Sequence, residues 1–199
     1  MSGTQVMLTQ QELNFLLRGL VPPEPTRINK SETRKLLVKS IFERWTLFYR
    51  MAMRSDIDRY IAEPQRIGAR FERYFTEHTS LERRATLARM NSGDCGTTAL
   101  AVGQTLEFLG FDVLYCDLLD HAAILVDGFY WDTLCPEGVP ALEQLLAYKQ
   151  ENASSMPISN AELIHSRYLP YDELGMQMVE TFVRMFSLNY KYPFTVITE

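Results

Sequence analysis

Residues 121–132 read His-Ala-Ala-Ile-Leu-Val-Asp-Gly-Phe-Tyr-Trp-Asp, and this stretch decides the fold. The Asp-Gly dipeptide in its middle lies between two apolar runs, which is the strongest short-range signal for a β-hairpin. A two-residue loop at this dipeptide places Ala123 opposite Asp132, because the turn fixes the register of the two strands. His121 and Asp132 then become diagonal neighbours across the two strands, with roughly 7–8 Å between their backbones, so their side chains can meet.

A second stretch, before the hairpin, predicts a helix that begins near a cysteine. Asn-Ser-Gly-Asp at 91–94 is a turn cluster, and apolar residues follow it at helical spacing as far as Leu109. Gly110 then provides a left-handed stop, so we expect a helix over 97–109 with Cys95 at its first turn. The unpaired amides and the positive end of the helix dipole favour a thiolate there and can receive an oxyanion.

The Gly-Asp-Cys turn that opens this helix and the hairpin together resemble the core of a known family. The family is the transglutaminase-like branch of the papain-like cysteine protease superfamily, and the resemblance covers about a quarter of the chain, roughly 91–136. It implies an α+β fold in which the nucleophile helix packs on a small antiparallel sheet. The roles that it implies are those of a catalytic triad, with Cys95 as nucleophile, His121 as general base and acid, and Asp132 as the residue that holds the imidazole.

The sequence also departs from the family pattern. Gly96 follows the nucleophile, where many members carry an aromatic residue, and the intervals between the three triad residues are compact. The family contains peptidases, amide-transferring enzymes, acetyltransferases and members without activity. The resemblance therefore specifies the chemistry better than the substrate.

Two functions from different classes stay open. The first is a cysteine-dependent acyl-transfer enzyme, either an amide hydrolase or peptidase or a transglutaminase-like acyltransferase, that acts on a protein, a peptide or a small acyl substrate. The second is an inactive or regulatory binding protein that keeps the fold and uses its N-terminal helices as the partner surface. Those helices are rich in arginine, and we expect the arginines to pair with Glu72, Glu77 and Glu82 on a solvated face.

Three further residues are candidates for substrate binding. Asn91 lies in the turn before Cys95, where a side-chain amide can stabilise an oxyanion, and Gly96 belongs to the same turn. Tyr130 shares a face of the hairpin with His121 and Asp132, by the period of two along a strand. It therefore either packs against the helix of Cys95 or lines a substrate cleft.

The composition bounds the size of the fold and its partners. A chain of 199 residues that is 46% hydrophobic can bury one substantial core, and we expect a single domain over 1–199. Its first part, 1–90, reads as helical, and 91–199 reads as the catalytic α+β core with a C-terminal helix and strand. A net charge of −5 gives no electrostatic reason to expect nucleic acid, and no apolar run reaches the length of about 20 residues that crosses a membrane.

The cysteines favour a reducing compartment. Three widely separated cysteines make a poor disulfide framework, and the N-terminus has no basic segment followed by a long apolar run, so we expect a cytoplasmic protein. We interpret Cys116 and Cys135 as small buried hydrophobes. The cysteines and His121 lack the paired spacing of a zinc site, and glycine motifs for phosphates or dinucleotides are absent, so we expect no metal and no cofactor.

Capping and periodicity predict the other elements. The helices expected outside the nucleophile segment cover 9–19, 29–61, 65–77, 80–90, 140–150 and 172–188. The strands expected cover 111–116, 121–126, 129–133 and 190–198, the last of which would extend the catalytic sheet.

Overall fold

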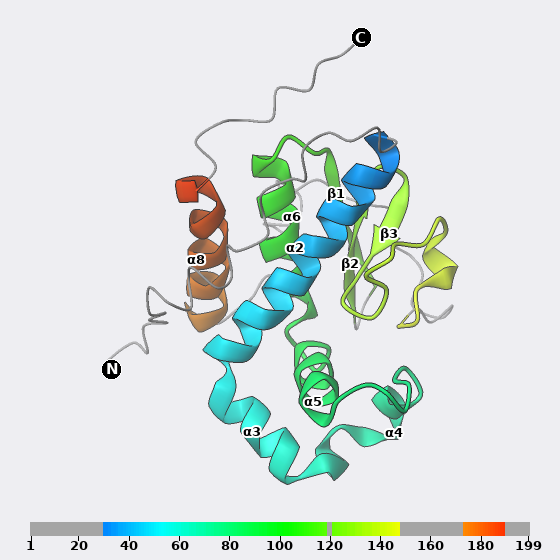
Figure 1. Ribbon diagram of the computed structural model, residues 1–199, viewed down its shortest axis with the longest axis vertical. Coiled ribbons are helices and arrows are strands. Elements are labelled where there is room, and N and C mark those ends of the chain that lie inside the picture. The colour runs from blue at the N-terminus through cyan, green and yellow to red at the C-terminus, as the bar shows by residue number, and fades with distance from the viewer. Residues whose placement is uncertain (1–29, 119–120, 148–172, 190–199) are drawn as a thin grey trace.

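The computed structural model describes residues 30–118, 121–147 and 173–189. The structure combines helices with a small three-stranded antiparallel sheet, which lies at one side of the molecule (Figure 1). The helix predicted over 9–19 and the strand predicted over 190–198 lie outside the described residues. Within the described parts, no helix combines the length and the apolar character that are needed to cross a membrane.

Helix α2 (Lys30–Ala52) runs across the molecule and buries one face in the core (Figure 1). Its N-terminal end is fixed to the hairpin, because Arg34 donates hydrogen bonds of 2.6 and 2.9 Å to the two carboxylate oxygens of Asp127. The sequence predicts one helix as far as residue 61, but the chain leaves the helical conformation at Met53, where ψ is 25°. Helix α3 (Arg54–Ala62) then starts in a new direction and buries Ile57 beside α5.

The helix predicted over 65–77 is wrong. The structure has a 3₁₀ turn, η1 (Pro64–Arg66), and a short helix, α4 (Gly68–Glu72), followed by turns. Gly68 has a φ of 72°, in the left-handed region that ends helices, so a continuous helix cannot pass through it. The helix predicted over 80–90 is confirmed as α5 (Leu81–Met90), whose first turn is capped by the Ser80 hydroxyl.

The sheet contains β1 (Val113–Asp117), β2 (Ala122–Val126) and β3 (Phe129–Trp131) in the order β1-β2-β3. The predicted hairpin register is confirmed, with Val126 opposite Phe129 and Ile124 opposite Trp131. Asp127 and Gly128 both have positive φ, 51° and 77°, as a two-residue type I′ turn requires. The two strands are shorter than predicted, since β2 begins after His121 and β3 ends before Asp132.

Helix α6 (Cys95–Phe108) covers one face of the sheet and begins at the cysteine itself. Its close approach depends on Gly103, because a Cβ there would lie 2.6 Å from Cζ of the buried Tyr115 ring on β1. The opposite face of the sheet carries a second, smaller apolar cluster. That cluster is formed by Cys116, Leu118, Ala123, Cys135 and Leu145, with Leu125, Tyr130, Val139 and Leu142 packed against it.

The C-terminal part of the described chain contributes one long helix. Helix α8 (Glu173–Asn189) confirms the helix predicted over 172–188, and it packs along α6. Phe182 on this helix meets the ring of Trp45 on α2 edge to face, with 5.1 Å between the ring centroids.

The helix predicted over 140–150 is wrong within the described residues. Only a 3₁₀ turn, η2 (Leu142–Gln144), forms there, between the extended residues Ala141 and Leu145. The extended backbone directs the Leu145 side chain into the second apolar cluster. The burial of this side chain outweighs the local preference of the sequence for a helix. Residues 148–150 lie outside the described residues.

Candidate active site

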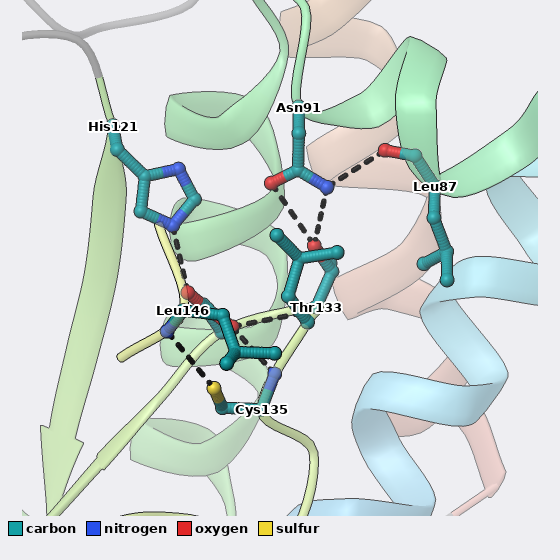
Figure 2. A network of polar contacts seen from close by, with 8 residues as sticks. Leu87, Asn91, His121, Thr133, Cys135 and Leu146 are labelled. Atoms are coloured by element: carbon teal, nitrogen blue, oxygen red, sulfur yellow. Dashed lines mark hydrogen bonds and ion pairs between the residues drawn. The ribbon is translucent and has the colours of Figure 1, made fainter. Parts of the chain in front are cut away.

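His121 and Asp132 form a buried polar pair at one end of the sheet. Nε2 of His121 lies 2.8 Å from Oδ2 of Asp132, and each residue is only 2% exposed. The other carboxylate oxygen, Oδ1, accepts hydrogen bonds from the backbone N–H groups of Leu134 (2.8 Å) and Cys135 (2.6 Å). Figure 2 shows the ring of His121 with its hydrogen bond and the neighbouring polar contacts. The contact that the hairpin register predicts is therefore present, and both oxygens of the carboxylate have partners.

The two residues meet because both lie just outside the strands. β2 begins at Ala122 and β3 ends at Trp131, so the alternation of sides along a strand does not govern His121 and Asp132. The backbone before β2 is held by a hydrogen bond of 2.8 Å from the Leu118 N–H to the His121 carbonyl. Both side chains can thus turn toward the N-terminal end of α6.

Cys95 is the first residue of α6 and is 8% exposed. Asp94, which precedes it, makes no side-chain cap of the helix. Its carboxylate instead accepts a hydrogen bond from the Tyr49 hydroxyl. It also forms an ion pair with Arg89, in which Nη1 of Arg89 lies 2.9 Å from Oδ2 of Asp94. The amides of the first helical turn lack intrahelical acceptors, and the Asp94 side chain does not occupy them either. They stay available for an anion.

The electrostatics of the site favour a charged imidazole. Burial alone disfavours the protonated ring, but hydrogen bonds and charge interactions with Asp132 and Cys95 outweigh burial and raise the pKa of His121 to about 10. Because Nε2 is bound to Asp132, Nδ1 is the nitrogen left for the thiol of Cys95. At neutral pH the ring therefore carries a positive charge beside the Cys95 thiol.

A small recess adjoins the thiol, and we call it the site recess. It has a volume of about 10 Å³, room for roughly one water molecule. Cys95, Asp132 and Thr133 contribute to its wall, together with the aromatic residues Phe42 and Trp131. The full wall consists of Phe42, Cys95, Thr98, Ala99, Ala122, Ala123, Trp131, Asp132 and Thr133.

Two of the three residues predicted to bind substrate have other contacts. The amide nitrogen of Asn91 donates to the Leu87 carbonyl (2.7 Å) and to the Thr133 hydroxyl (2.8 Å), so both of its hydrogens are engaged inside the protein. Tyr130 packs in the second apolar cluster, on the face of the sheet away from α6, and it does not line the site recess. Strand alternation places it there, whereas Asp132 escapes the alternation. Gly96 lies in the first turn of α6, as predicted, and is buried.

The other two cysteines are buried, which confirms their interpretation as small hydrophobes. Burial raises the pKa of the Cys116 thiol to about 12. Burial, together with the charge of Asp132, raises the pKa of the Cys135 thiol to about 12 as well. These thiols are therefore protonated at neutral pH and differ chemically from a thiol beside an imidazolium.

Several arginines of the N-terminal helices form ion pairs, partly with other partners than expected, and Glu77 lies 3.5 Å from His78 instead of beside an arginine. Arg83 forms two hydrogen bonds of 2.9 Å with the carboxylate of Glu43, and Arg84 pairs with Glu72 at 3.2 Å. Glu82 pairs with Arg50 of α2.

Sequence reasoning missed the residues that anchor the site from a distance. Tyr49, Arg89 and Thr133 each contact a turn that carries a candidate catalytic residue. The contacts of Tyr49 with Asp94 and of Thr133 with Asn91 join segments 45 and 42 positions apart, for which a single sequence contains no signal. Comparisons with protein-family models, with curated proteins and with solved structures found no match.

Proposed function

We propose that the protein is a cysteine-dependent acyl-transfer enzyme in which Cys95, His121 and Asp132 form a catalytic triad. The observation that carries the proposal is the buried His121 ring, held by Asp132 through Nε2 and charged beside the thiol at the start of α6. A nucleophile, a base and an orienting carboxylate in this relation are what thiol-mediated acyl transfer requires. The nucleophile helix on a small antiparallel sheet supports a core of the transglutaminase-like, papain-like type.

The proposed reaction assigns one task to each group. The Cys95 thiolate attacks the acyl carbonyl carbon, and the oxyanion that forms is received by backbone N–H groups of Cys95 and Gly96 at the helix start. The His121 imidazolium gives its proton to the leaving amine as the bond from carbon to nitrogen breaks, which leaves a thioester on Cys95. Water or an acceptor amine then attacks the thioester, gives a proton back to His121 and releases the thiolate. Asp132 holds the ring in place through its hydrogen bond to Nε2.

The substrate class follows from the chemistry, with its size limited by the site recess. An amide of a protein or peptide, or a small acyl donor, supplies the carbonyl that the thiolate needs. Apolar walls from Phe42, Ala99 and Trp131 favour a small group next to the reacting carbon. A bulky acyl group requires the recess to widen, because about 10 Å³ holds roughly one water molecule.

One observation favours the second candidate, a binding protein that keeps the fold without turnover. Cys95 is 8% exposed, so little of the thiol meets solvent. In that case the N-terminal helices α2, α3 and α5 would serve as the partner surface, and the buried polar pair would act as a structural element.

Trapping of an acyl-enzyme distinguishes the two candidates. The full chain would be mixed with p-nitrophenyl acetate at neutral pH, quenched in acid and examined by intact mass and peptide mapping. The enzyme proposal expects one acetyl group on the peptide of Cys95, absent in Cys95→Ser and strongly reduced in His121→Ala, while Cys135→Ser behaves as the parent protein. Acetylation that is unchanged in Cys95→Ser, or no acetylation at all, would support the binding protein instead.

A further inference from the structure

One buried amide joins the two segments that carry the candidate triad. Asn91 ends α5 four positions before Cys95, and Thr133 directly follows Asp132. Nδ2 of Asn91 donates to the Thr133 hydroxyl at 2.8 Å, and the same hydroxyl lies 3.2 Å from Oδ1 of Asn91. Figure 2 shows the two side chains facing each other, with the Leu87 carbonyl as the second acceptor of the amide.

We propose that Asn91 and Thr133 are positioning residues, and that their contact sets the distance between the Cys95 turn and the Asp132 segment. We call this contact the Asn91–Thr133 bridge. The inference rests on the proposed function, because it assigns a role in the reactivity of Cys95. It replaces the expectation that Asn91 stabilises an oxyanion directly, since the structure shows both of its amide hydrogens engaged elsewhere.

Burial makes the bridge specific. Asn91 is 4% exposed and Thr133 is 7% exposed, so solvent replaces neither partner easily. Removal of either side chain leaves a buried polar group without its hydrogen bond, which is costly in a dry environment. The bridge therefore selects one arrangement of the two segments over those in which they slide apart.

The bridge completes a set of anchors around the nucleophile turn. On one side, Asp94 is bound by Tyr49 of α2 and Arg89 of α5. On the other side, Asn91 is bound to the segment after β3. The Tyr49 and Arg89 contacts attach the turn to the helices alone, whereas only the bridge, among these contacts, attaches it to the strand end that holds Asp132 and through it His121.

The segment after β3 transmits the position of the bridge to the carboxylate. Thr133 lies between Asp132 and Leu134, whose N–H donates to Oδ1 of Asp132. A shift of Thr133 therefore moves the carboxylate together with the amides that hold it, and His121 follows through its hydrogen bond at Nε2. The consequence is a longer distance between the imidazole and Cys95, which weakens the thiolate.

The test measures the reactivity of Cys95 in the full chain as a function of pH. Alkylation by iodoacetamide would be followed by peptide mapping between pH 5 and pH 9, in the parent protein and in Thr133→Val. We expect Thr133→Val to alkylate Cys95 about three- to tenfold more slowly at neutral pH, the effect of one net hydrogen bond, with the midpoint of the profile at higher pH. Thr133→Ser keeps the hydroxyl and should restore the parent profile.

A matched control separates position from stability. Thr105 is a fully buried threonine of α6 whose hydroxyl donates to the Ala101 carbonyl at 2.7 Å, outside the bridge. Thr105→Val loses a comparable hydrogen bond and should lower the free energy of unfolding without moving the pH profile of Cys95. Asn91→Ala should act like Thr133→Val, and the double variant should lose no more than either single one, because both changes remove the same bridge.

Two results would overturn the inference, and they differ from each other. If Thr133→Val and Thr105→Val both keep the parent profile, the bridge is only structural and the proposed function is untouched. If His121→Ala also keeps the parent profile, the thiol does not depend on the imidazole at all, and the proposed function falls together with the role of the bridge.

Discussion

Nε2 of His121 and Oδ2 of Asp132 lie 2.8 Å apart at a place where solvent reaches neither side chain. A buried charge pair is tolerated only where the remaining lone pairs also find donors, because desolvation of the two charges is expensive. Asp132 meets this condition through the amides of Leu134 and Cys135. The imidazole, the carboxylate and the turn after β3 therefore act as one unit, and changes to any of them should be felt at Cys95.

The first prediction concerns the carboxylate. Asp132→Asn keeps an oxygen for the two backbone amides, so the fold should survive, but its NH₂ group faces Nε2 and favours a neutral ring. Formation of the acyl-enzyme with p-nitrophenyl acetate should slow by at least about tenfold; the same change in a serine protease triad costs about 10⁴ in turnover. Asp127→Asn in the hairpin turn is the matched control and should keep the parent rate. Full activity in Asp132→Asn would reduce the site to a Cys-His dyad.

The second prediction is a dependence of stability on pH. The pKa of His121 is raised to about 10 by Asp132 and Cys95 against the opposing effect of burial. Its charged form therefore stabilises the fold fully below about pH 6.5, the ordinary histidine value, and this contribution is lost as the pH rises toward 10. The free energy of unfolding should fall by up to about 1.4 kcal/mol per pH unit in that window.

Urea unfolding at pH 6.5, 7.5 and 8.5 measures this slope. The highest pH is kept at 8.5 because Cys116 and Cys135 add a further loss of stability near about pH 9. Their pKa values are raised in the folded protein, so their thiols ionise first in the unfolded chain. In Asp132→Asn, where the main partner of the charged ring is gone, the slope should become flatter. Stability that rises over this range would contradict the charged ring, whereas constant stability would mean that another group loses a proton on folding as His121 gains one.

The third prediction compares two thiols of equal exposure. Cys95 and Cys135 are each 8% exposed, so exposure of the residue does not distinguish them, and we expect ionisation to decide the rate. The pKa of Cys135 is raised to about 12, which leaves almost no thiolate at pH 7. Brief treatment with iodoacetamide followed by peptide mapping should therefore label Cys95 well before Cys135. Equal labelling of both thiols would remove the chemical distinction on which the assignment of the nucleophile depends.

The fourth prediction concerns the contact between helix and sheet. In Gly103→Ala the new Cβ would lie 2.6 Å from Cζ of Tyr115, whose ring is buried and has little room to move. Overpacking of this kind costs about 1–3 kcal/mol, so the melting temperature should drop by several degrees. Shortening the partner in Gly103→Ala/Tyr115→Leu should recover part of the loss. A single variant as stable as the parent would mean that α6 can move away from β1 at no cost.

The elements that the sequence predicts well are those whose signals are local. The Asp-Gly turn determines the register by itself, because both residues have the positive φ that the turn needs. The start of α6 at Cys95 follows a polar turn, and its end follows from Gly110. The hairpin also brings the segments of His121 and Asp132 together, although their side chains meet only because both residues lie outside the strands.

The predictions that are wrong concern residues whose positions depend on contacts with distant parts of the chain. The segment around Leu145 has a helical pattern, yet the burial of that side chain under the sheet keeps it extended. Tyr130 was expected on the face of the site, but the strand ends between it and Asp132, so the two residues separate. The partner of Asn91 is Thr133, which no local pattern indicates.

The aromatic contact between α2 and α8 has a consequence for the growing chain on the ribosome. Trp45 and Phe48 can meet Phe182 only after synthesis has passed residue 182. At about 5–20 residues per second, the apolar face of α2 waits on the order of ten seconds for its partner. The N-terminal helices therefore cannot complete their packing ahead of the rest during synthesis, and the nascent chain depends for that time on whatever shields exposed apolar surface in the cell.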